Sequence, residues 1–222
     1  MLKRLFDIVC SLIALGLLAI PMLLIALAIR LTSRGPAFFC QRRAGWKGKP
    51  FTMLKFRTMR IDADPYGESP HEGTDPRLTR LGRFLRETSL DEFPQLLNIL
   101  AGQMSLVGPR PLYERQASLW NARQRRRLNV RPGLTGYAQA YGRGNMTHEE
   151  KIELDVEYVE KQSIWLDLRI ICRTFLNLLG HRDDIYERQY SLTHERESNV
   201  PTGTDGPPAS QDEARRASNS ET

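Results

Sequence analysis

The sequence offers few of the residues that build metal centres and disulfide frameworks. Its three cysteines, Cys10, Cys40 and Cys172, are widely spaced and form no CxxC pair, and its four histidines show no ligand spacing with them. These absences exclude the common zinc motifs and a disulfide-stabilised fold. Reduced thiols are typical of a soluble portion that faces the cytoplasm.

The sequence also lacks internal repeats and any surplus of acidic residues. Its 222 residues predict one domain with at most an appendage. Lys and Arg number 32 against 26 Asp and Glu, which gives a formal net charge of +6. This excess favours an anionic partner, and nucleic acid, acidic lipid headgroups and a phosphorylated substrate all remain open.

One long apolar run, Ile8 to Ile29, is interrupted only by Ser11, Gly16 and Pro21. A straight helix of this length would measure about 33 Å, enough to cross the hydrocarbon core of a membrane. A cleaved signal peptide is the weaker interpretation, because the apolar part is too long.

Basic residues flank this run on both sides, with Lys3 and Arg4 before it and Arg30 and Arg34 after it. Positively charged residues that flank a membrane segment tend to lie on the cytoplasmic side, so both ends of the run are predicted to be cytoplasmic. Pro21 removes a backbone donor in mid-segment and should bend the helix. A bent re-entrant helix satisfies both observations, while a kinked single crossing remains the alternative because spans tolerate proline.

The next segments predict a hairpin, a loop and an amphipathic helix. Phe38 to Arg43 and Phe51 to Thr58 are short runs around a Gly45–Gly48 turn, as in a hairpin. Residues 61–75 hold two prolines and two glycines and are expected to form a loop. Leu78 to Arg86 places apolar and basic residues at helical spacing, which suits either a helix in the headgroup layer or an ordinary surface helix.

The second half of the chain predicts three further helices. Tyr113 to Leu128 should be helical and ends in Arg125–Arg127, which is either a solvated face or a grip for lipid phosphates. A capping-box pattern at Thr147–Glu150 starts a helix that ends near residue 162. From Ile164 to Leu178 apolar residues recur at spacings of 3 and 4, and interspersed charges favour a surface-lying or packed helix over a second span.

Residues 88–111 carry the strongest chemical signal. Asp91 and Glu92 are adjacent carboxylates, and a proline-flanked Arg110 follows them. An acid pair beside a fixed arginine suits chemistry on a phosphate ester, because Mg²⁺ can sit on the carboxylates while the arginine holds phosphoryl oxygens. The alternative is structural, since Ser89 followed by Glu92 matches a capping box that would only close a helix start.

A series of short strings in this chain resembles the bacterial sugar transferases, the monotopic phosphoglycosyl transferases that start glycan assembly on a lipid. The strings cover about residues 3 to 180 in family-like order and spacing. They are Lys3-Arg4-Leu5-Phe6-Asp7, Lys55-Phe56-Arg57-Thr58-Met59, Asp75-Pro76-Arg77-Leu78-Thr79, Thr88-Ser89-Leu90-Asp91-Glu92, Met104-Ser105-Leu106-Val107-Gly108-Pro109-Arg110-Pro111, Arg131-Pro132-Gly133-Leu134-Thr135-Gly136, Leu154-Asp155-Val156-Glu157-Tyr158-Val159 and Leu166-Asp167-Leu168.

The resemblance implies an activity and its partners. Such enzymes transfer a sugar 1-phosphate from a UDP-sugar to a polyprenyl phosphate such as undecaprenyl phosphate, and UMP leaves. They use Mg²⁺ and a covalent aspartyl intermediate. The expected location is the bacterial inner membrane, with the catalytic domain on its cytoplasmic face. Membrane lipids are expected partners, and downstream glycosyltransferases are possible ones. The resemblance also suggests a minimal member, without the extra N-terminal membrane helices of larger relatives.

The resemblance assigns expected roles to individual residues. Asp91 is the implied nucleophile, and Glu92 is the implied base or metal ligand, with both as candidate ligands for Mg²⁺. Asp155 and Asp167 match acidic positions of the family, although each can equally pair with a nearby arginine or stabilise a helix. Candidate phosphate or headgroup contacts, each of which can also be structural, are Arg110, Arg86, Lys55, Arg57, Arg131 and Arg143.

Two positions depart from the family pattern. Ile20 stands before Pro21 where many relatives have serine, and the Gly142-Arg143-Gly144-Asn145 stretch differs from the usual Gly-Arg-Asn order. With these departures, the expected fold is α/β and mainly helical, that of a monotopic membrane protein with interfacial amphipathic helices. Its expected parts are a re-entrant membrane helix at 1–35, a cytoplasmic sugar transferase domain at 36–190 and a disordered tail at 191–222.

Two rival functions remain for comparison. A membrane-tethered nucleic-acid-binding module would use the basic residues from Arg123 to Arg131, but the sequence has no RNP, zinc-finger or helix-turn-helix signature. It would also leave Asp91 and Glu92 unexplained, so no nucleic-acid partner is expected. A non-catalytic scaffold that recruits glycan enzymes is the second rival. Neither the sugar nor the glycan pathway follows from the sequence.

Overall fold

The computed structural model of the chain describes residues 2–180 except 65–66, 68–69, 71–73 and 143–145. All the described elements belong to one unit, Met1–Gln189. The predicted tail at 191–222 and the candidate residue Arg143 lie outside the described residues.

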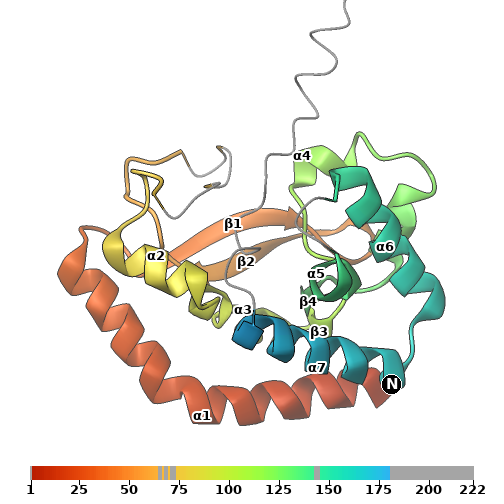
Figure 1. Cartoon of the computed structure of the whole chain (residues 1–222), viewed down its shortest axis with the longest axis horizontal. Coiled ribbons are helices and arrows are strands. Elements are labelled where there is room, and N and C mark those ends of the chain that lie inside the picture. Colours follow the sequence, from red (N-terminus) through yellow and green to blue (C-terminus); the bar gives the residue numbers. More distant parts are fainter. Residues whose placement is uncertain (1, 65–66, 68–69, 71–73, 143–145, 181–222) are drawn as a thin grey trace, which may run out of the picture. The chain divides into compact units, whose positions relative to one another are not determined.

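The chain begins with one long helix, α1 (Leu2–Thr32), which contains Pro21. Figure 1 shows that its axis changes direction partway along, as expected for a helix that includes a proline. Among the described helices, α1 alone is long and apolar enough to cross a membrane, with a mean hydropathy of 2.9. The expected apolar bent helix is therefore present.

One face of α1 packs on the rest of the unit along both of its halves. Ala14, Leu15 and Leu18 pack against a core cluster that includes Phe51 and Ile99. Further along, Ile29 is itself buried in a second cluster, and neighbouring side chains of α1 support it. The opposite face leaves a row of large apolar side chains exposed, which includes Leu12, Ile13, Leu17, Ile20, Leu23 and Leu24.

The predicted hairpin is confirmed. Strands β1 (Phe38–Ala44) and β2 (Pro50–Phe56) pair antiparallel, with Phe38 opposite Phe56. A short 3-10 turn, Trp46–Gly48, joins them. The hairpin supplies Phe51, Met53 and Phe56 to the two cores against which α1 packs.

Two helices lie on either side of the candidate acid pair. Helix α2 (Arg80–Glu87) starts at Thr79, whose side-chain oxygen accepts a hydrogen bond from the Gly82 nitrogen at 2.8 Å. Helix α3 (Gln95–Leu100) follows the pair. Asn98 of α3 accepts from the Leu54 nitrogen and donates to the Thr52 carbonyl, which fixes α3 to β2. The predicted helix at 78–86 is thus confirmed, and the described residues of 61–75 form no helix or strand.

The second sheet is parallel and very short. Strand β3 (Ser105–Val107) pairs with β4 (Gly133–Thr135), and the Gly108 nitrogen donates to the Thr135 carbonyl at 2.9 Å. A Cβ atom on Gly133 would lie 2.1 Å from the Gly108 nitrogen, so only glycine permits this approach. The turn that carries Arg110 starts directly at the end of β3.

The predicted continuous helix from Tyr113 to Leu128 is wrong. The segment instead contains α4 (Glu114–Ala117) and a 3-10 helix, Gln124–Asn129. Buried Trp120 lies between them in a cluster with Ala44 and Ile152. Because the chain must turn to bury the Trp120 ring, it cannot continue as one helix.

Three helices complete the described chain: α5 (Tyr137–Tyr141), α6 (His148–Lys161) and α7 (Ile164–Gly180). The capping box predicted at Thr147–Glu150 is present and starts α6. Helix α7 is packed rather than free, because Ile170 and Asp167 are buried while Trp165 and Phe175 are exposed. The described residues are thus mainly helical, as expected from the sequence, and they form two small sheets, of which only the hairpin was predicted.

Candidate active site

Asp91 and Glu92 lie on a one-turn 3-10 helix, Leu90–Glu92, between α2 and α3. Ser89 precedes it in the left-handed region, with φ of 56°, and its side chain makes no capping bond. The capping-box alternative for Glu92 is therefore wrong. Strained backbone of this kind is most often found at functional sites.

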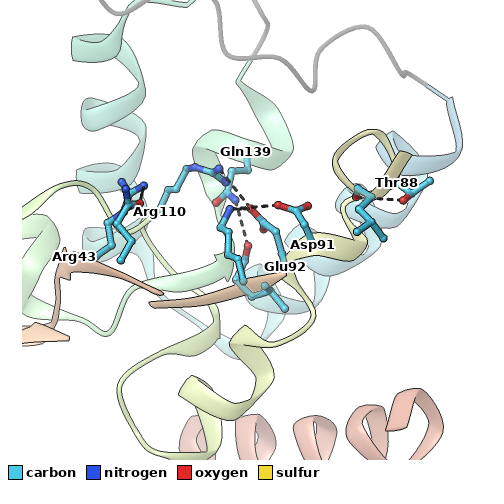
Figure 2. Close-up of polar contacts among 10 residues, drawn as sticks. Arg43, Thr88, Asp91, Glu92, Arg110 and Gln139 are labelled. Carbon is cyan, nitrogen blue, oxygen red and sulfur yellow. Dashed lines mark hydrogen bonds and ion pairs between the residues drawn. The ribbon is translucent and has the colours of Figure 1, made fainter. Parts of the chain in front are cut away.

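Two cations converge on the acid pair. The Lys55 Nζ atom of β2 lies 2.6 Å from Glu92 Oε1 and 3.9 Å from Asp91 Oδ2. The Arg110 Nη2 atom lies 3.5 Å from the same Glu92 oxygen. Figure 2 shows Arg110 reaching towards Glu92 and Asp91 from the side opposite Thr88. The fold thus brings Lys55, from the hairpin, and Arg110, from the turn after β3, to the adjacent carboxylates of Asp91 and Glu92.

The two carboxylates differ in their electrostatics. Asp91 is only 4 % exposed, and burial raises its pKa although the positive charge of Lys55 opposes this. For Glu92, burial also acts to raise the pKa, but the charges of Lys55 and Arg110 outweigh it and lower the pKa to about 2. Glu92 is thus ionised at neutral pH, and a carboxylate of such low pKa is a poor general base.

Arg86, near the end of α2, adds a third positive charge to the site. Its charge lowers the pKa values of both Asp91 and Glu92. The Nη1 atom of Arg86 is buried and has no hydrogen-bond partner among the described residues. A buried guanidinium nitrogen without a partner suits a site that receives an anionic group.

The acid pair fits a magnesium ion that arrives with a phosphorylated substrate. No cluster of three or more His, Cys, Asp or Glu ligands occurs in the described part of the chain. Mg²⁺ in such sites commonly takes one or two carboxylates together with substrate phosphates, so Asp91 and Glu92 supply a sufficient donor set. Lys55 already neutralises part of the charge on Glu92 Oε1.

The two other candidate acids form structural links instead of contacts with the dyad. Asp155 makes a buried ion pair with Arg127. Asp167 accepts from Tyr158 Oη at 2.6 Å and from Lys3 Nζ at 2.6 Å. The structural alternative considered for both residues is therefore the one that the contacts support.

Arg57 and Arg131 also make structural contacts. The Arg57 Nη2 atom donates to the backbone and side chain of Ser33, at 3.0 Å each, which holds the end of α1. Arg131 donates to the Gly102 carbonyl at 2.8 Å and stacks on Trp46, with 4.5 Å from Cζ to the ring centre. These contacts account for Arg131, whereas the Nε and Nη1 atoms of Arg57 are buried without a hydrogen-bond partner among the described residues.

A set of links between α1 and the rest of the unit escaped the sequence analysis. Asp7, 2 % exposed, accepts from Ser105 Oγ and from the Leu106 nitrogen, both at 3.0 Å. Arg4 donates to the carbonyls of Ile99 and Leu100 at the end of α3. The sequence did contain a signal for these links. Arg4 and Asp7 are charged residues at the start of an apolar run, and charged side chains are not tolerated in a helix end that is buried in lipid.

The arrangement can perform phosphoryl transfer. A buried carboxylate, Asp91, can act as a nucleophile, and Lys55, Arg86 and Arg110 place three positive charges around it. Cations fixed in a partly buried site stabilise the charge that develops on phosphoryl oxygens.

Comparisons with known proteins agree with this chemistry. The family described as Bacterial sugar transferase matches residues 1–181 of the chain. The chain is 46 % identical over 178 residues to the uncharacterized sugar transferase EpsL of Bacillus subtilis. The matched residues cover 80 % of this chain and 87 % of EpsL.

Two further relatives have similar coverage. A UDP-glucose:undecaprenyl-phosphate glucose-1-phosphate transferase of Caulobacter vibrioides is 45 % identical over 80 % of this chain and 69 % of its own length. The exopolysaccharide production protein ExoY of Rhizobium meliloti is 39 % identical over 78 % of this chain and 84 % of its own length. The resemblance found in the sequence is thus confirmed, and the chain belongs to the bacterial sugar transferase family of enzymes.

Proposed function

We propose that the protein is a phosphoglycosyl transferase that moves a sugar 1-phosphate from a UDP-sugar to undecaprenyl phosphate and releases UMP. The observation that carries this proposal is the pair of buried Asp91 and partly buried Glu92, which faces Lys55 and Arg110. The name of the Caulobacter relative, a UDP-glucose:undecaprenyl-phosphate glucose-1-phosphate transferase, supports the donor and acceptor classes and makes UDP-glucose the first donor to test.

In the first half-reaction, a carboxylate oxygen of Asp91 attacks the phosphorus that bears the sugar. A bond forms between this oxygen and phosphorus, the bond from phosphorus to the bridging oxygen breaks, and UMP leaves with the electron pair. Arg110 and Lys55 hold phosphoryl oxygens and offset the repulsion between the anionic carboxylate and the anionic diphosphate.

In the second half-reaction, a phosphate oxygen of undecaprenyl phosphate attacks the same phosphorus. The Asp91 oxygen leaves as a carboxylate, and the product is an undecaprenyl-diphosphate sugar. Because the steps are separate, the nucleotide and the lipid need not occupy the site together. Mg²⁺ bound at Asp91 and Glu92 would neutralise phosphate oxygens during both steps.

The membrane arrangement follows from the two faces of α1. Its exposed apolar face suits lipid, while its packed face carries contacts with the unit near both ends, through Arg4, Asp7 and Ile29. We therefore propose a re-entrant helix that enters and leaves on the cytoplasmic face of the inner membrane. Exposed Trp165 and Phe175 of α7 suit the same lipid interface, where the acceptor headgroup lies.

The test uses purified full-length protein with radiolabelled UDP-glucose, Mg²⁺ and undecaprenyl phosphate. The expected result is release of UMP with formation of a labelled glycolipid and, when lipid is omitted, a labelled protein adduct. Asp91→Asn should abolish both the adduct and turnover. Glu153→Gln, which removes an exposed carboxylate paired with Arg123, is the matched control and should retain activity.

Each contrary result identifies which part of the proposal fails. Absence of UMP release with a panel of UDP-sugars would favour a non-catalytic scaffold that recruits downstream glycosyltransferases. Turnover with sequential kinetics and no trapped adduct would retain the activity but remove the covalent intermediate. Parental activity in folded Asp91→Asn would remove Asp91 from the mechanism.

A further inference from the structure

We propose that Arg127 and Arg43 are positioning residues that aim Arg110 at the acid pair, by holding the backbone turn from which the Arg110 side chain projects. The inference rests on the proposed function, in which Arg110 holds a phosphoryl group. The sequence assigned Arg43 no candidate role and placed Arg127 in a basic run expected to be a solvated face or a contact for lipid phosphates. The solvated face is wrong for Arg127, which is 3 % exposed.

The two arginines bind consecutive carbonyls of the turn. Arg127 Nη2 donates to the carbonyl of Arg110 at 2.7 Å, and Arg43 Nη1 donates to the carbonyl of Pro111 at 3.3 Å. Backbone hydrogen bonds hold the turn on either side, because Gly133 N donates to the Pro109 carbonyl and Ala44 N donates to the Leu112 carbonyl, both at 3.0 Å. Pro109 and Pro111 have no N–H group to donate. Between those two carbonyls, the carbonyls of Arg110 and Pro111 accept from side chains of two distant segments.

Arg127 is itself held rigidly. Its guanidinium pairs with Asp155 of α6 and lies 4.8 Å from the centre of the Trp120 ring. Both members of the ion pair are about 3 % exposed. One nitrogen of Arg127 thus contacts both the Asp155 carboxylate and the Arg110 carbonyl, which connects α6 to the turn.

Arg43 is fixed from the hairpin. Its Cζ atom lies 3.8 Å from the centre of the Tyr113 ring, and its Nε atom donates to Gln41 Oε1 at 3.0 Å. The Ala44 nitrogen donates to the Leu112 carbonyl at 3.0 Å, which binds the chain after the turn to β1. Figure 2 shows Arg43 on the side of Arg110 away from Asp91 and Glu92.

Packing behind the turn leaves it little freedom to shift. The space between Pro109, Arg110, Trp120 and Arg127 is a cavity of about 10 Å³, which has room for about one water molecule. Since the Arg110 tip is 3.5 Å from Glu92, a small displacement of the turn changes that contact directly.

Stability alone does not account for a buried pair between Arg127 and Asp155. Taking both charges out of water is costly, and apolar residues of similar volume in place of such a pair often leave a protein equally stable or more stable. Here the Nη2 atom of Arg127 donates both to the Asp155 carboxylate and to the Arg110 carbonyl, while Nε and Nη1 have no hydrogen-bond partner among the described residues. The ion pair therefore contributes more by positioning Arg110 than by stabilising the fold.

The experiment separates positioning from folding by replacing the pair with apolar residues. Arg127→Met alone leaves Asp155 buried without its partner and should unfold at a lower temperature. The double variant Arg127→Met/Asp155→Leu should regain the parental Tm yet keep kcat/KM for the UDP-sugar about 10- to 100-fold below the parent. Arg126→Met is the matched control, because Arg126 is exposed, pairs with Glu160 and should retain full activity.

A double-mutant cycle with Arg110 adds a readout that a merely structural role would not move. In an Arg110→Ala background, the double variant should lower kcat/KM, and the affinity for UDP measured by calorimetry, by less than about 3-fold, because the group it positions is already gone. Arg43→Met should show the same dependence on Arg110.

Two results would overturn the inference while the activity stands: a stable double variant with parental kcat/KM, or a full additional loss in the Arg110→Ala background. A parent protein that neither binds UDP nor releases UMP from any UDP-sugar would overturn the proposed function and this assignment together. The behaviour of the parent protein therefore distinguishes the two failures.

Discussion

At the scale of single residues, Lys55 is the group on which the electrostatics of the site most depend. Its Nζ atom is 2.6 Å from Glu92 and 3.9 Å from Asp91, and its side chain is only 15 % exposed. It lies on β2, so the hairpin sets its position. The lysine opposes the burial that acts on both carboxylates, and its charge keeps Glu92 ionised.

Removing this charge should therefore impair the reaction strongly. In Lys55→Met, the pKa of Glu92 should rise from about 2, and kcat for UMP release should fall by about 100-fold or more, because two buried acids lose their nearest cation. Steady-state kinetics with UDP-glucose measures the effect. Lys49→Met, on an exposed lysine of the same hairpin, is the control and should change kcat by less than 2-fold. Equal activity of the two variants would contradict the role of Lys55.

Asp155 gives a prediction on pH and stability. Burial raises the pKa of Asp155 to about 6, although Arg127 opposes the rise, against an ordinary value of 3.8. Between these two values the folded protein binds more protons than the unfolded chain, so the contribution to stability is full below pH 4 and is lost as the pH rises through 6. The size of this loss is on the order of 2–3 kcal/mol.

Thermal unfolding of the detergent-solubilised protein between pH 4 and 7 checks the sign. The parent should lose stability over this range relative to Arg127→Met/Asp155→Leu, in which the titrating group is absent. Because the other titrating groups are common to both proteins, their difference isolates Asp155. A parent that gains stability relative to the variant as the pH rises would show that the direction of the pKa shift is wrong.

At the scale of elements, the small parallel sheet places the turn of Arg110. Strands β3 and β4 approach so closely that Gly133 and Gly136 would each put a Cβ atom within 2.2 Å of the backbone of Gly108. The contact is between backbone atoms, which cannot move aside as a flexible side chain can. Glycine at these positions therefore decides where β3 ends and where the turn begins.

Gly133→Ala should accordingly destabilise the protein by about 1–3 kcal/mol or more, because overpacking forces the two strands apart. The measurement is Tm, together with kcat/KM, which should also fall as the turn shifts. Gly16→Ala is the control, since no atom lies within 4 Å of the added Cβ and alanine favours a helix. An unchanged Tm in Gly133→Ala would refute the close approach.

At the scale of the whole described unit, α1 is the element whose contacts bear on the proposed membrane arrangement. Near its start, Lys3, Arg4 and Asp7 bind α7, α3 and β3 respectively. Near its end, Ile29 is buried and Ser33 accepts from Arg57. The contacts near both ends are with the same unit (Figure 1), and they support the proposed re-entrant arrangement, in which both ends lie on one side of the membrane.

Cysteine labelling tests this topology in intact cells. In a background with Cys10, Cys40 and Cys172 replaced by serine, single cysteines at Leu2 and Arg34 should both resist a membrane-impermeant maleimide. Both should react once the cells are permeabilised, which is the control for reactivity. Labelling of one position from outside would establish a single crossing and contradict the re-entrant helix.

The sequence predicted those features that depend on local patterns. Hydrophobic periodicity and turn residues located α1, the hairpin, α2, α6 and α7, because each has its own apolar face or start signal. The same reasoning failed for Tyr113 to Leu128, where burial of Trp120 interrupts a segment with helical propensity. Burial of Trp120 is a tertiary contact, and a tertiary contact cannot be predicted from the local sequence pattern.

The acid pair and its arginine were likewise visible in the sequence, since Asp91, Glu92 and the proline-flanked Arg110 form a compact motif. Which cations face the pair was decided only by the fold, which selects Lys55, Arg86 and Arg110 and gives Arg57 and Arg131 to other contacts. The sequence by itself determined the chemistry available, because that depends on residue types. Tertiary structure alone decided which charges meet, because Coulomb energy depends on distance and burial and not on order along the chain.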